Sequence, residues 1–186
     1  MGVSIALIHY PVKDKKRDIV SSSITNFDIH DIARSATTYG VRRYFVVTPI
    51  PSQQWLAERI IKHWREGFGA EYNQTRREAM LCVSVVSSLD DVFDAIKSDT
   101  GLEPLFVATS AQPLSYSIKY EEFRKRILKS DEEFCITFGT GWGLHPTIIE
   151  EMDFILEPIY GVSEYNHLSV RAAVGIILDR LLGKRE

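Results

Sequence analysis

Residues 134–149 read FCITFGTGWGLHPTII, an apolar run followed by three alternating glycines and then a proline that can start a helix. Apolar runs of strand length that alternate with stretches at helical spacing are typical of an α/β fold around a mainly parallel sheet. In such sheets, ligands bind beyond the carboxyl ends of the strands. The glycine-rich segment that leaves the strand Phe134–Phe138 is therefore the first candidate for a binding loop.

The same alternation extends outward from this stretch in both directions. We predict five further strands, at residues 3–8, 43–47, 81–86, 105–109 and 154–156. The spacing also predicts helices at residues 28–39, 49–67, 88–100, 120–128, 146–152 and 169–182. No repeat or low-complexity linker interrupts this order, so we expect residues 1–186 to form a single domain.

Capping and periodicity give these helices specific expectations. Ser52 and Ser88 are predicted N-caps, and Leu56, Ile60 and Trp64 are expected on one buried face of the second helix. The last helix is expected to bury Val170, Val174, Ile177, Leu178 and Leu181 and to end at Gly183.

Three segments that leave predicted strands carry few charges. Residues 104–118 and 134–149 have none, and residues 157–170 read EPIYGVSEYNHLSV. Surface loops are usually charged, so uncharged loops rich in Gly, Ser, Thr and aromatic residues indicate a small-molecule pocket. Gly139, Gly141 and Gly143 would let backbone approach a ligand or adopt positive φ, although plain tight turns are an alternative. The spacing GxGxG matches neither GxGxxG nor GxxxxGK[ST].

The net charge of −3 hides an asymmetry along the chain. Residues 1–77 hold 12 Lys/Arg against 7 Asp/Glu, whereas residues 78–186 hold 10 against 18. This balance excludes a strongly basic nucleic-acid binder and still lets a polyanion meet the N-terminal part. The basic clusters are Lys13–Arg17 (KDKKR), Arg42 with Arg43, and Arg76 with Arg77.

The sequence shows no signal peptide and no apolar run of bilayer length, so a cytoplasmic location is expected. Cys82 and Cys135 lie in apolar runs without CxxC spacing and are predicted to be buried free thiols. The five histidines show no metal-binding spacing, and no metal site is expected.

The ordered set resembles the SPOUT family of S-adenosylmethionine-dependent RNA methyltransferases, more narrowly the small bacterial domain also found fused to tRNA guanine-N1 methyltransferases. The residues that carry the resemblance are DIHDIARSATTYGVRRYFVV (28–47), the polar loop after the fourth strand, FGTGWGL (138–144) and IYGVSEYNHLSVRAAVGIILDRLL (159–182). The last is the most specific, because Asn166–Ser169 fit the family's polar turn before its final helix.

The resemblance implies a C-terminal deep trefoil knot, over about residues 104–183, and a homodimer. It also implies that S-adenosylmethionine binds in the knot loops, held by backbone of Thr109, Gly141, Ile159 and Leu168, with Leu144, Leu156 and Leu168 as apolar walls. Uncharged loops suit a sulfonium cation, since a carboxylate would stabilise its ground state too strongly. The full cofactor set implied is Ala108, Thr109, Ser110, Gly139, Thr140, Gly141, Trp142, Gly143, Leu144, Leu156, Pro158, Ile159, Gly161, Tyr165, Asn166, His167, Leu168 and Ser169.

The implied reaction is methyl transfer to a ribose 2′-hydroxyl or a base nitrogen of tRNA or rRNA. Arg34 matches the catalytic arginine of the ribose-methylating subgroup, with an ion pair to Asp31 or Glu157 as its structural alternative. That subgroup has Asn six residues earlier, where this chain has Asp28. Candidate proton acceptors are Asp28, His30, Asp31 and His167; Trp142 and Tyr165 are candidates for stacking on adenine or a target base.

Two other functions compete with this one. One is a SPOUT-like module that binds S-adenosylmethionine or RNA without catalysis, and the other is a flavodoxin-like nucleotide-binding enzyme.

Overall fold

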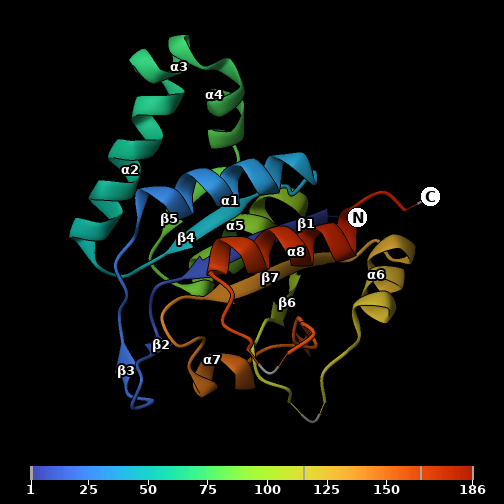
Figure 1. Cartoon of the computed structure of the whole chain (residues 1–186). Helices are drawn as coiled ribbons and strands as arrows, with labels where there is room; N and C mark the ends of the chain where they lie inside the picture. The colour runs from blue at the N-terminus through green and yellow to red at the C-terminus, as the bar shows by residue number, and fades with distance from the viewer. Residues whose placement is uncertain (1, 115, 164, 186) are drawn as a thin grey trace.

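The computed structural model describes residues 2–114, 116–163 and 165–185, so that Ser115 and Glu164, which fall in two of the predicted loops, lie outside the described residues. In chain order (Figure 1) the elements are β1 (Gly2–Ile8), β2 (Val12–Lys13), β3 (Ile19–Val20), α1 (Asn26–Thr38), β4 (Tyr44–Val47), α2 (Pro51–Arg65), α3 (Phe68–Tyr72), α4 (Gln74–Met80), β5 (Val83–Val86), α5 (Leu89–Thr100), β6 (Pro104–Ala108), α6 (Tyr120–Lys129), β7 (Glu133–Gly139), α7 (Pro146–Glu150), β8 (Phe154–Ile155) and α8 (Val170–Leu182).

The predicted α/β fold with a parallel sheet is confirmed. Six strands pair in the order β5-β4-β1-β7-β6-β8, and every pairing between them is parallel. Ile8 lies opposite Val47 and Gly139, and Ala108 lies opposite Thr137 and Ile155, so the carboxyl ends of the strands meet at one edge. Counting only these six strands along the chain, the order is 3-2-1-5-4-6. Neither flavodoxin-like nor Rossmann sheets have this order, so the flavodoxin-like alternative is wrong.

Helices cover both faces of the sheet because its strands are apolar on both sides. Along β1, Val3, Ile5 and Leu7 belong to a core cluster that also contains residues of α1, α6 and α8. Ala6 and Ile8 belong to a second cluster, with residues of α5 and α7. Figure 1 shows α1 and α8 side by side over the near face, and α5 behind the sheet.

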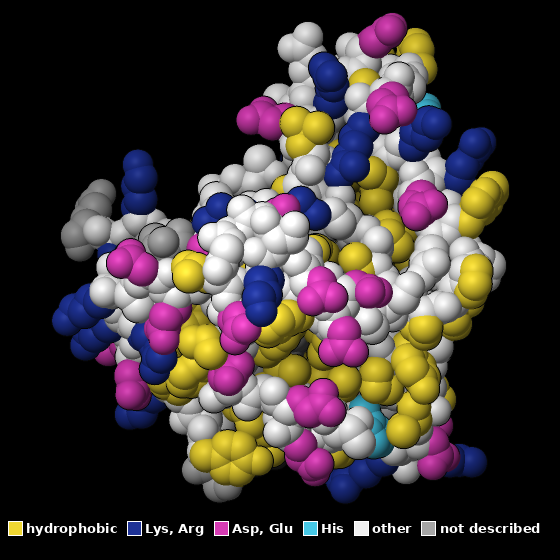
Figure 2. All heavy atoms as spheres, turned by 180° about the vertical axis from the view of Figure 1, so that it is seen from behind, with side chains coloured by type: hydrophobic (Ala, Val, Ile, Leu, Met, Phe, Trp, Pro, Cys, Tyr) yellow, Lys and Arg dark blue, Asp and Glu magenta, His cyan; other side chains and the backbone are white. Residues whose placement is uncertain are grey.

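The view from behind shows an uneven distribution of charge. In Figure 2, hydrophobic side chains gather across the middle of this face among Asp and Glu side chains, whereas Lys and Arg lie mainly toward its margins. This face is therefore a poor candidate for contact with a polyanion.

Several boundary predictions are confirmed. Ser88 caps α5 in a reciprocal capping box with Asp91, and Gly101 ends that helix with a φ of 75°. Ser169 caps α8, whose buried residues Val174, Ile177, Leu178 and Leu181 were all expected, and Gly183 follows its last residue.

The prediction for α2 is wrong in its cap and at Leu56, whereas Ile60 and Trp64 pack against the first core cluster as expected. The helix begins at Pro51 with Ile50 as N-cap, and Ser52 lies inside the first turn. Its buried residues are Ala57 and Ile61, while Leu56 is 38% exposed. A one-residue step on a helix rotates the side chain by about 100°, so Ala57 packs inward where Leu56 was expected.

Three short stretches of structure were not predicted. The basic connector after β1 forms an antiparallel hairpin, β2–β3, and residues 68–80 form α3 and α4. Strand β5 begins at Val83, so Cys82 lies before it, half-buried, with its thiol 3.3 Å from the Ala79 carbonyl. Cys135 is buried and free as expected, and burial raises the pKa of its thiol.

Among the described residues, no helix combines the length and the apolar composition that a bilayer crossing needs. In that same part of the chain, no group of three or more His, Cys, Asp or Glu side chains is arranged to hold a metal ion.

Candidate functional site

The three loops with few charges leave neighbouring strands at the carboxyl edge of the sheet. Strands β7, β6 and β8 are adjacent, and Leu156, after β8, donates its backbone N–H to the Ala108 carbonyl at 2.9 Å. The Asn166 side-chain amide donates to the Ala111 carbonyl at 2.8 Å, which ties the last loop to the loop after β6. The fold thus brings together residues up to 55 positions apart in sequence.

The glycine loop after β7 is shaped by its own chain. A Cβ at Gly139 would lie 2.4 Å from the Leu144 nitrogen, so only glycine allows this close backbone approach. Gly141 and Gly143 have φ values of 59° and 98°, a region that favours glycine. Tight packing and positive φ therefore account for all three glycines.

The strand β2 holds this loop in place. The Trp142 N–H donates to the Lys13 carbonyl at 3.1 Å, and the Lys13 N–H donates to the Gly143 carbonyl at 3.0 Å. Val12 and Leu144 form an isolated antiparallel bridge, and both are buried in the second core cluster.

The predicted apolar walls differ in accessibility. Leu144 and Leu156 are buried in the two core clusters, whereas Leu168 is 45% exposed. The aromatic candidates Trp142 and Tyr165 are 57% and 74% exposed. Of the predicted set, Leu168, Trp142 and Tyr165 are thus the large side chains that are free to meet a ligand.

The remaining predicted cofactor residues surround the same edge. Thr109 donates both its N–H and its hydroxyl to the Thr137 carbonyl, at 3.2 and 2.9 Å. Ser110 accepts the Gln112 N–H, Pro158 is buried and Ile159 packs on the first core cluster. A Cβ at Gly161 would meet no atom within 4 Å, and His167 stacks edge-on with Tyr165 at 5.3 Å between ring centroids.

A hydrogen-bonded chain at the β1–β7 junction was not predicted. The His9 Nδ1 and Ser22 Oγ are 2.8 Å apart, Ser22 bonds to the Thr140 hydroxyl, and Thr140 donates to the Ile8 carbonyl at 3.0 Å. With Thr140 donating onward, Ser22 donates to Thr140, so His9 carries its proton on Nδ1. Burial lowers the pKa of His9 to about 4, and the neutral ring orients Thr140 at the start of the glycine loop. The sequence signal for these hydrogen bonds was a histidine placed directly after a buried strand.

Arg34 lies on the exposed side of α1. Within the described residues, its guanidinium has no carboxylate partner within 4.0 Å. The predicted alternative partners are engaged elsewhere: Asp31 pairs with Arg171, and Glu157 accepts the Tyr120 N–H. Its side chain is thus available to an external ligand.

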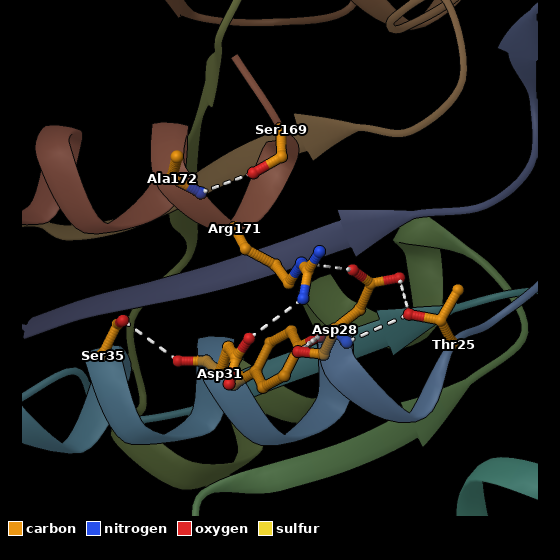
Figure 3. Close-up of polar contacts among 8 residues, drawn as sticks. Thr25, Asp28, Asp31, Ser35, Ser169, Arg171 and Ala172 are labelled. Atoms are coloured by element: carbon orange, nitrogen blue, oxygen red, sulfur yellow. Dashed lines mark hydrogen bonds and ion pairs between the residues drawn. The ribbon is translucent and has the colours of Figure 1, made fainter.

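Arg171, in the first turn of α8, was missed by sequence reasoning. Figure 3 shows it reaching from α8 toward two carboxylates of α1: its Nη1 is 3.1 Å from Asp31 and its Nε is 3.6 Å from Asp28. Asp28 also accepts the hydroxyl of Thr25 at 2.6 Å. A cation is unfavourable at a helix N-terminus, so an arginine there was a signal that a carboxylate lies nearby. Both candidate acid–base carboxylates are thus held in ion pairs.

The histidine candidates lie in different surroundings. His30 is buried edge-on to Trp64 at 5.3 Å, and burial, with Arg76 as a weaker cause, lowers its pKa. His167 is exposed in the loop before α8. Of the four proton-acceptor candidates, only His167 is both exposed and part of the three-loop edge.

The three predicted basic clusters do not share a surface. Arg42 and Arg43 precede β4, at the amino edge of the sheet, and pair with Glu133 and Asp99 at 3.0 Å each. Arg76 lies over the Trp64 ring at 4.5 Å, and Arg77 donates to the Arg65 carbonyl. Only the Lys13–Arg17 cluster adjoins the glycine loop.

Two surface hollows lie away from this edge. One of about 390 Å³ lies between α2 and β5, and one of about 340 Å³ lies near Leu102 and Glu133. The carboxyl edge is the better candidate, because it has loops with few charges and exposed aromatic side chains, whereas the volume of a hollow does not indicate what it binds.

Among the described loop residues at this edge, the lone carboxylate is Glu157, which accepts a hydrogen bond from the Tyr120 N–H. Loops whose one described carboxylate is already hydrogen-bonded fit a sulfonium ligand.

The same parallel α/β fold occurs in solved structures described as a methylase family protein and as a tRNA modifying enzyme. A putative methylase family protein from Neisseria gonorrhoeae has a similar structure, with a TM-score of 0.65 and 15% identity over 98% of this chain and 82% of that one. The TrmH/SpoU tRNA modifying enzyme of Aquifex aeolicus matches with a TM-score of 0.53 and 18% identity, over 97% and 73% of the two chains.

Sequence relatives identify the family. Residues 2–183 match the family model described as SAM-dependent RNA methyltransferase. An uncharacterized protein of A. aeolicus is 43% identical over 98% of this chain and 89% of its own length. A tRNA (guanine-N(1)-)-methyltransferase of Oleidesulfovibrio alaskensis is 40% identical over 96% of this chain, which spans 41% of that relative. The chain belongs to the SAM-dependent RNA methyltransferase family.

Proposed function

We propose that this chain transfers a methyl group from S-adenosylmethionine to tRNA or rRNA at the carboxyl edge of its sheet. The observation that carries this proposal is the convergence of three loops with few charges, the glycine loop among them; the Asn166–Ala111 hydrogen bond ties the other two together. When bound, S-adenosylmethionine supplies an electrophilic methyl group on a sulfonium. The residues of the chain then have to hold the ligand, align an RNA oxygen or nitrogen in line with the S–CH₃ bond, and accept the proton it loses.

The proposed cofactor contacts are those expected from the sequence, with roles refined by exposure. Exposed Leu168, Trp142 and Tyr165 supply apolar and stacking contacts, and the backbone around Gly141, Ile159 and Leu168 supplies polar ones. Buried Leu144 and Leu156 support the loops from beneath.

We also propose the knot and the homodimer that the resemblance implies. The knot is supported by strand order: β8 lies outside β6, and the chain must return past the loop after β6, which Asn166 contacts, to reach α8 beside α1. The dimer is supported by the exposed apolar side chain of Phe27, on α1.

Arg34 is the proposed catalytic residue. Its free, exposed guanidinium suits contact with an RNA phosphate or with the attacking group. His167 is the proposed proton acceptor, because Asp28 and Asp31 are engaged by Arg171 and His30 is buried. Both target atoms, a ribose 2′-hydroxyl and a base nitrogen, remain in the proposal, and an RNA substrate agrees with the expected cytoplasmic location.

The test is methyl transfer from radiolabelled S-adenosylmethionine to bulk tRNA and rRNA, with nucleoside mass spectrometry to locate the methyl group. We expect Arg34→Ala to lower the rate about 100-fold or more with cofactor affinity unchanged within about twofold. Lys125→Ala, at an exposed position of α6, is the matched control with wild-type activity. Equal activity of Arg34→Ala and wild type would remove Arg34 from the mechanism.

One observation favours a second function, an accessory module that binds S-adenosylmethionine or RNA without catalysis. The chain corresponds to 41% of the length of the tRNA (guanine-N(1)-)-methyltransferase relative, so in that protein the matching region accompanies another. Cofactor binding without methyl transfer to any RNA tested would support this alternative.

A further inference from the structure

The hairpin β2–β3 places a row of cations on a rigid turn. Lys15, Lys16 and Arg17 are consecutive and exposed, and Figure 1 shows the hairpin projecting from the body of the molecule beyond the carboxyl edge of the sheet. Within the described residues, none of the three forms an ion pair within 4.0 Å. Their charges are thus free to meet an external anion.

The turn is ordered by its own hydrogen bonds. The Asp14 carboxylate accepts the N–H groups of Lys16 and Asp18 at 2.7 and 2.9 Å, and the Asp14 N–H donates to the Asp18 carbonyl at 3.0 Å. This carboxylate is therefore committed to the turn and leaves the lysines and the arginine outward.

Arg17 has a φ of 71°, a conformation in which a non-glycine residue is uncommon. Glycine or asparagine would adopt it at lower cost. Backbone strain of this kind concentrates at functional sites, and here it presents a third cation beside two lysines.

The opposite end of the same hairpin contacts the glycine loop. Beyond the two backbone hydrogen bonds of Lys13, a Cβ at Gly141 would lie 3.2 Å from the Lys13 carbonyl and 3.9 Å from a Val12 methyl group. Any shift of β2 thus moves the surface on which Gly141 and Trp142 rest.

We propose that residues 12–20 form a phosphate-binding finger that couples RNA binding to the conformation of the cofactor loop. The proposal rests on the proposed function and adds a partner contact and a coupling route to it. The tip carries three exposed cations beside one exposed carboxylate, Asp18, and no aromatic side chain; this excess of positive charge suits the sugar–phosphate backbone rather than bases. RNA bound at the tip would hold β2 in one position, and β2 in turn holds the glycine loop. RNA and S-adenosylmethionine therefore each strengthen the binding of the other. Coupling between two sites is reciprocal.

The experiment measures S-adenosylmethionine affinity by calorimetry, with and without saturating bulk tRNA, and tRNA affinity with and without S-adenosylmethionine. For wild type we expect each ligand to improve the affinity of the other by the same factor, about fivefold or more. A wild-type factor of one would overturn the coupling.

Two sets of variants separate contact from coupling. Replacing Lys15, Lys16 and Arg17 by Gln should weaken tRNA binding at least tenfold and lower the salt slope by about 2 to 3, with S-adenosylmethionine affinity in the absence of RNA unchanged. Replacing Lys125, Lys129 and Lys184 by Gln removes the same charge from exposed positions and should leave tRNA binding unchanged. Wild-type tRNA affinity in the first triple variant would refute the finger.

Val12→Ala keeps the tip and loosens the contact with the glycine loop. We expect normal tRNA affinity alone and a coupling factor near one; full coupling in a folded Val12→Ala protein would refute the route through β2. Should Val12→Ala unfold, Lys13→Pro, which deletes the N–H that binds Gly143, makes the same test.

Further outcomes distinguish the inference from the function beneath it. If wild type binds no S-adenosylmethionine at millimolar concentration, the proposed function fails. If it binds and methylates RNA while the first triple variant behaves as wild type, only the finger fails. Equal binding of polyglutamate and tRNA at the tip would point to an acidic protein partner and overturn the RNA assignment.

Discussion

Arg171 links the two helices that flank the proposed site. Its guanidinium lies between Asp28 and Asp31 of α1 and over the Phe27 ring at 5.3 Å. The Asp28 side chain is only 11% exposed, so removal of the cation leaves a nearly buried charge without its partner. The pair therefore fixes how the N-terminus of α8, and the loop before it, sits against α1.

We expect Arg171→Leu to lower the free energy of unfolding by about 1 to 3 kcal/mol. Arg126→Leu is the control: it breaks an exposed pair with Glu132 at 2.6 Å and should cost less than about 1 kcal/mol. Urea unfolding measures both. Equal losses in the two variants would mean that the Arg171 cluster is an ordinary surface contact.

His9 predicts a dependence of stability on acid. Its pKa is lowered from 6.5 to about 4 by burial, so between these values the unfolded chain binds more protons than the folded one. Stability is then present above the unfolded pKa and is lost as the pH falls toward the folded one. Between pH 7 and pH 5 the loss should be about 2 kcal/mol.

Urea unfolding at these pH values checks this prediction, with His9→Gln as the matched variant that cannot titrate. Its stability should fall less over the same interval. Identical pH dependence in the two proteins would show that His9 already titrates normally in the folded state.

For single residues, local contacts such as helix caps were easier to predict from the sequence than contacts between distant residues. The predicted cap Ser88 is confirmed, because a cap bonds within its own turn, and the last helix begins at Ser169 as expected. The Arg171–Asp31 pair joins residues 140 positions apart, and no local pattern reports such a contact.

The glycine loop is the element on which the proposed site depends. A methyl group at position 139 would meet the Leu144 nitrogen at 2.4 Å and the Gly143 carbonyl carbon at 2.7 Å, and backbone cannot move aside as a side chain can. We expect Gly139→Ala to lower the free energy of unfolding by about 1 to 3 kcal/mol and to weaken S-adenosylmethionine binding.

Gly161→Ala is the comparison for thermal and urea unfolding, because a Cβ there meets no atom within 4 Å. Its stability should stay within about 0.5 kcal/mol of wild type. A Gly139→Ala protein as stable as Gly161→Ala would contradict the packing account of the loop.

Long apolar elements were predictable and short polar ones were not. The buried strands β1 and β7 are mainly apolar runs, and the buried residues of α8 recur at helical spacing. The hairpin β2–β3 has two-residue strands held by turn bonds and by the distant glycine loop, which a local pattern does not contain. Residues 68–80 form helices packed on α1 and α2, again through tertiary contacts.

Strand order is a property of the whole molecule, and it decided between folds. Alternating strands and helices predicted a parallel sheet, but several orders share that alternation. The observed placement of β7 beside β1, with β6 and β8 beyond it, excludes the flavodoxin-like alternative. The structure also shows which of the basic residues in the N-terminal part lie near the proposed site: of the three basic clusters, only Lys13–Arg17 adjoins it.

The proposed homodimer predicts the mass of the molecule in solution. Sedimentation equilibrium should give twice the chain mass of 21.2 kDa at micromolar concentration. A mass of one chain at every concentration would contradict the dimer.

The most direct test of the central claim is a calorimetric titration of the wild-type protein with S-adenosylmethionine. The convergence of three loops with few charges at one edge of the sheet predicts saturable binding with one site per chain and a dissociation constant below about 1 mM, in the range of small-molecule sites. The absence of binding at millimolar ligand would contradict the claim that this edge is a cofactor site.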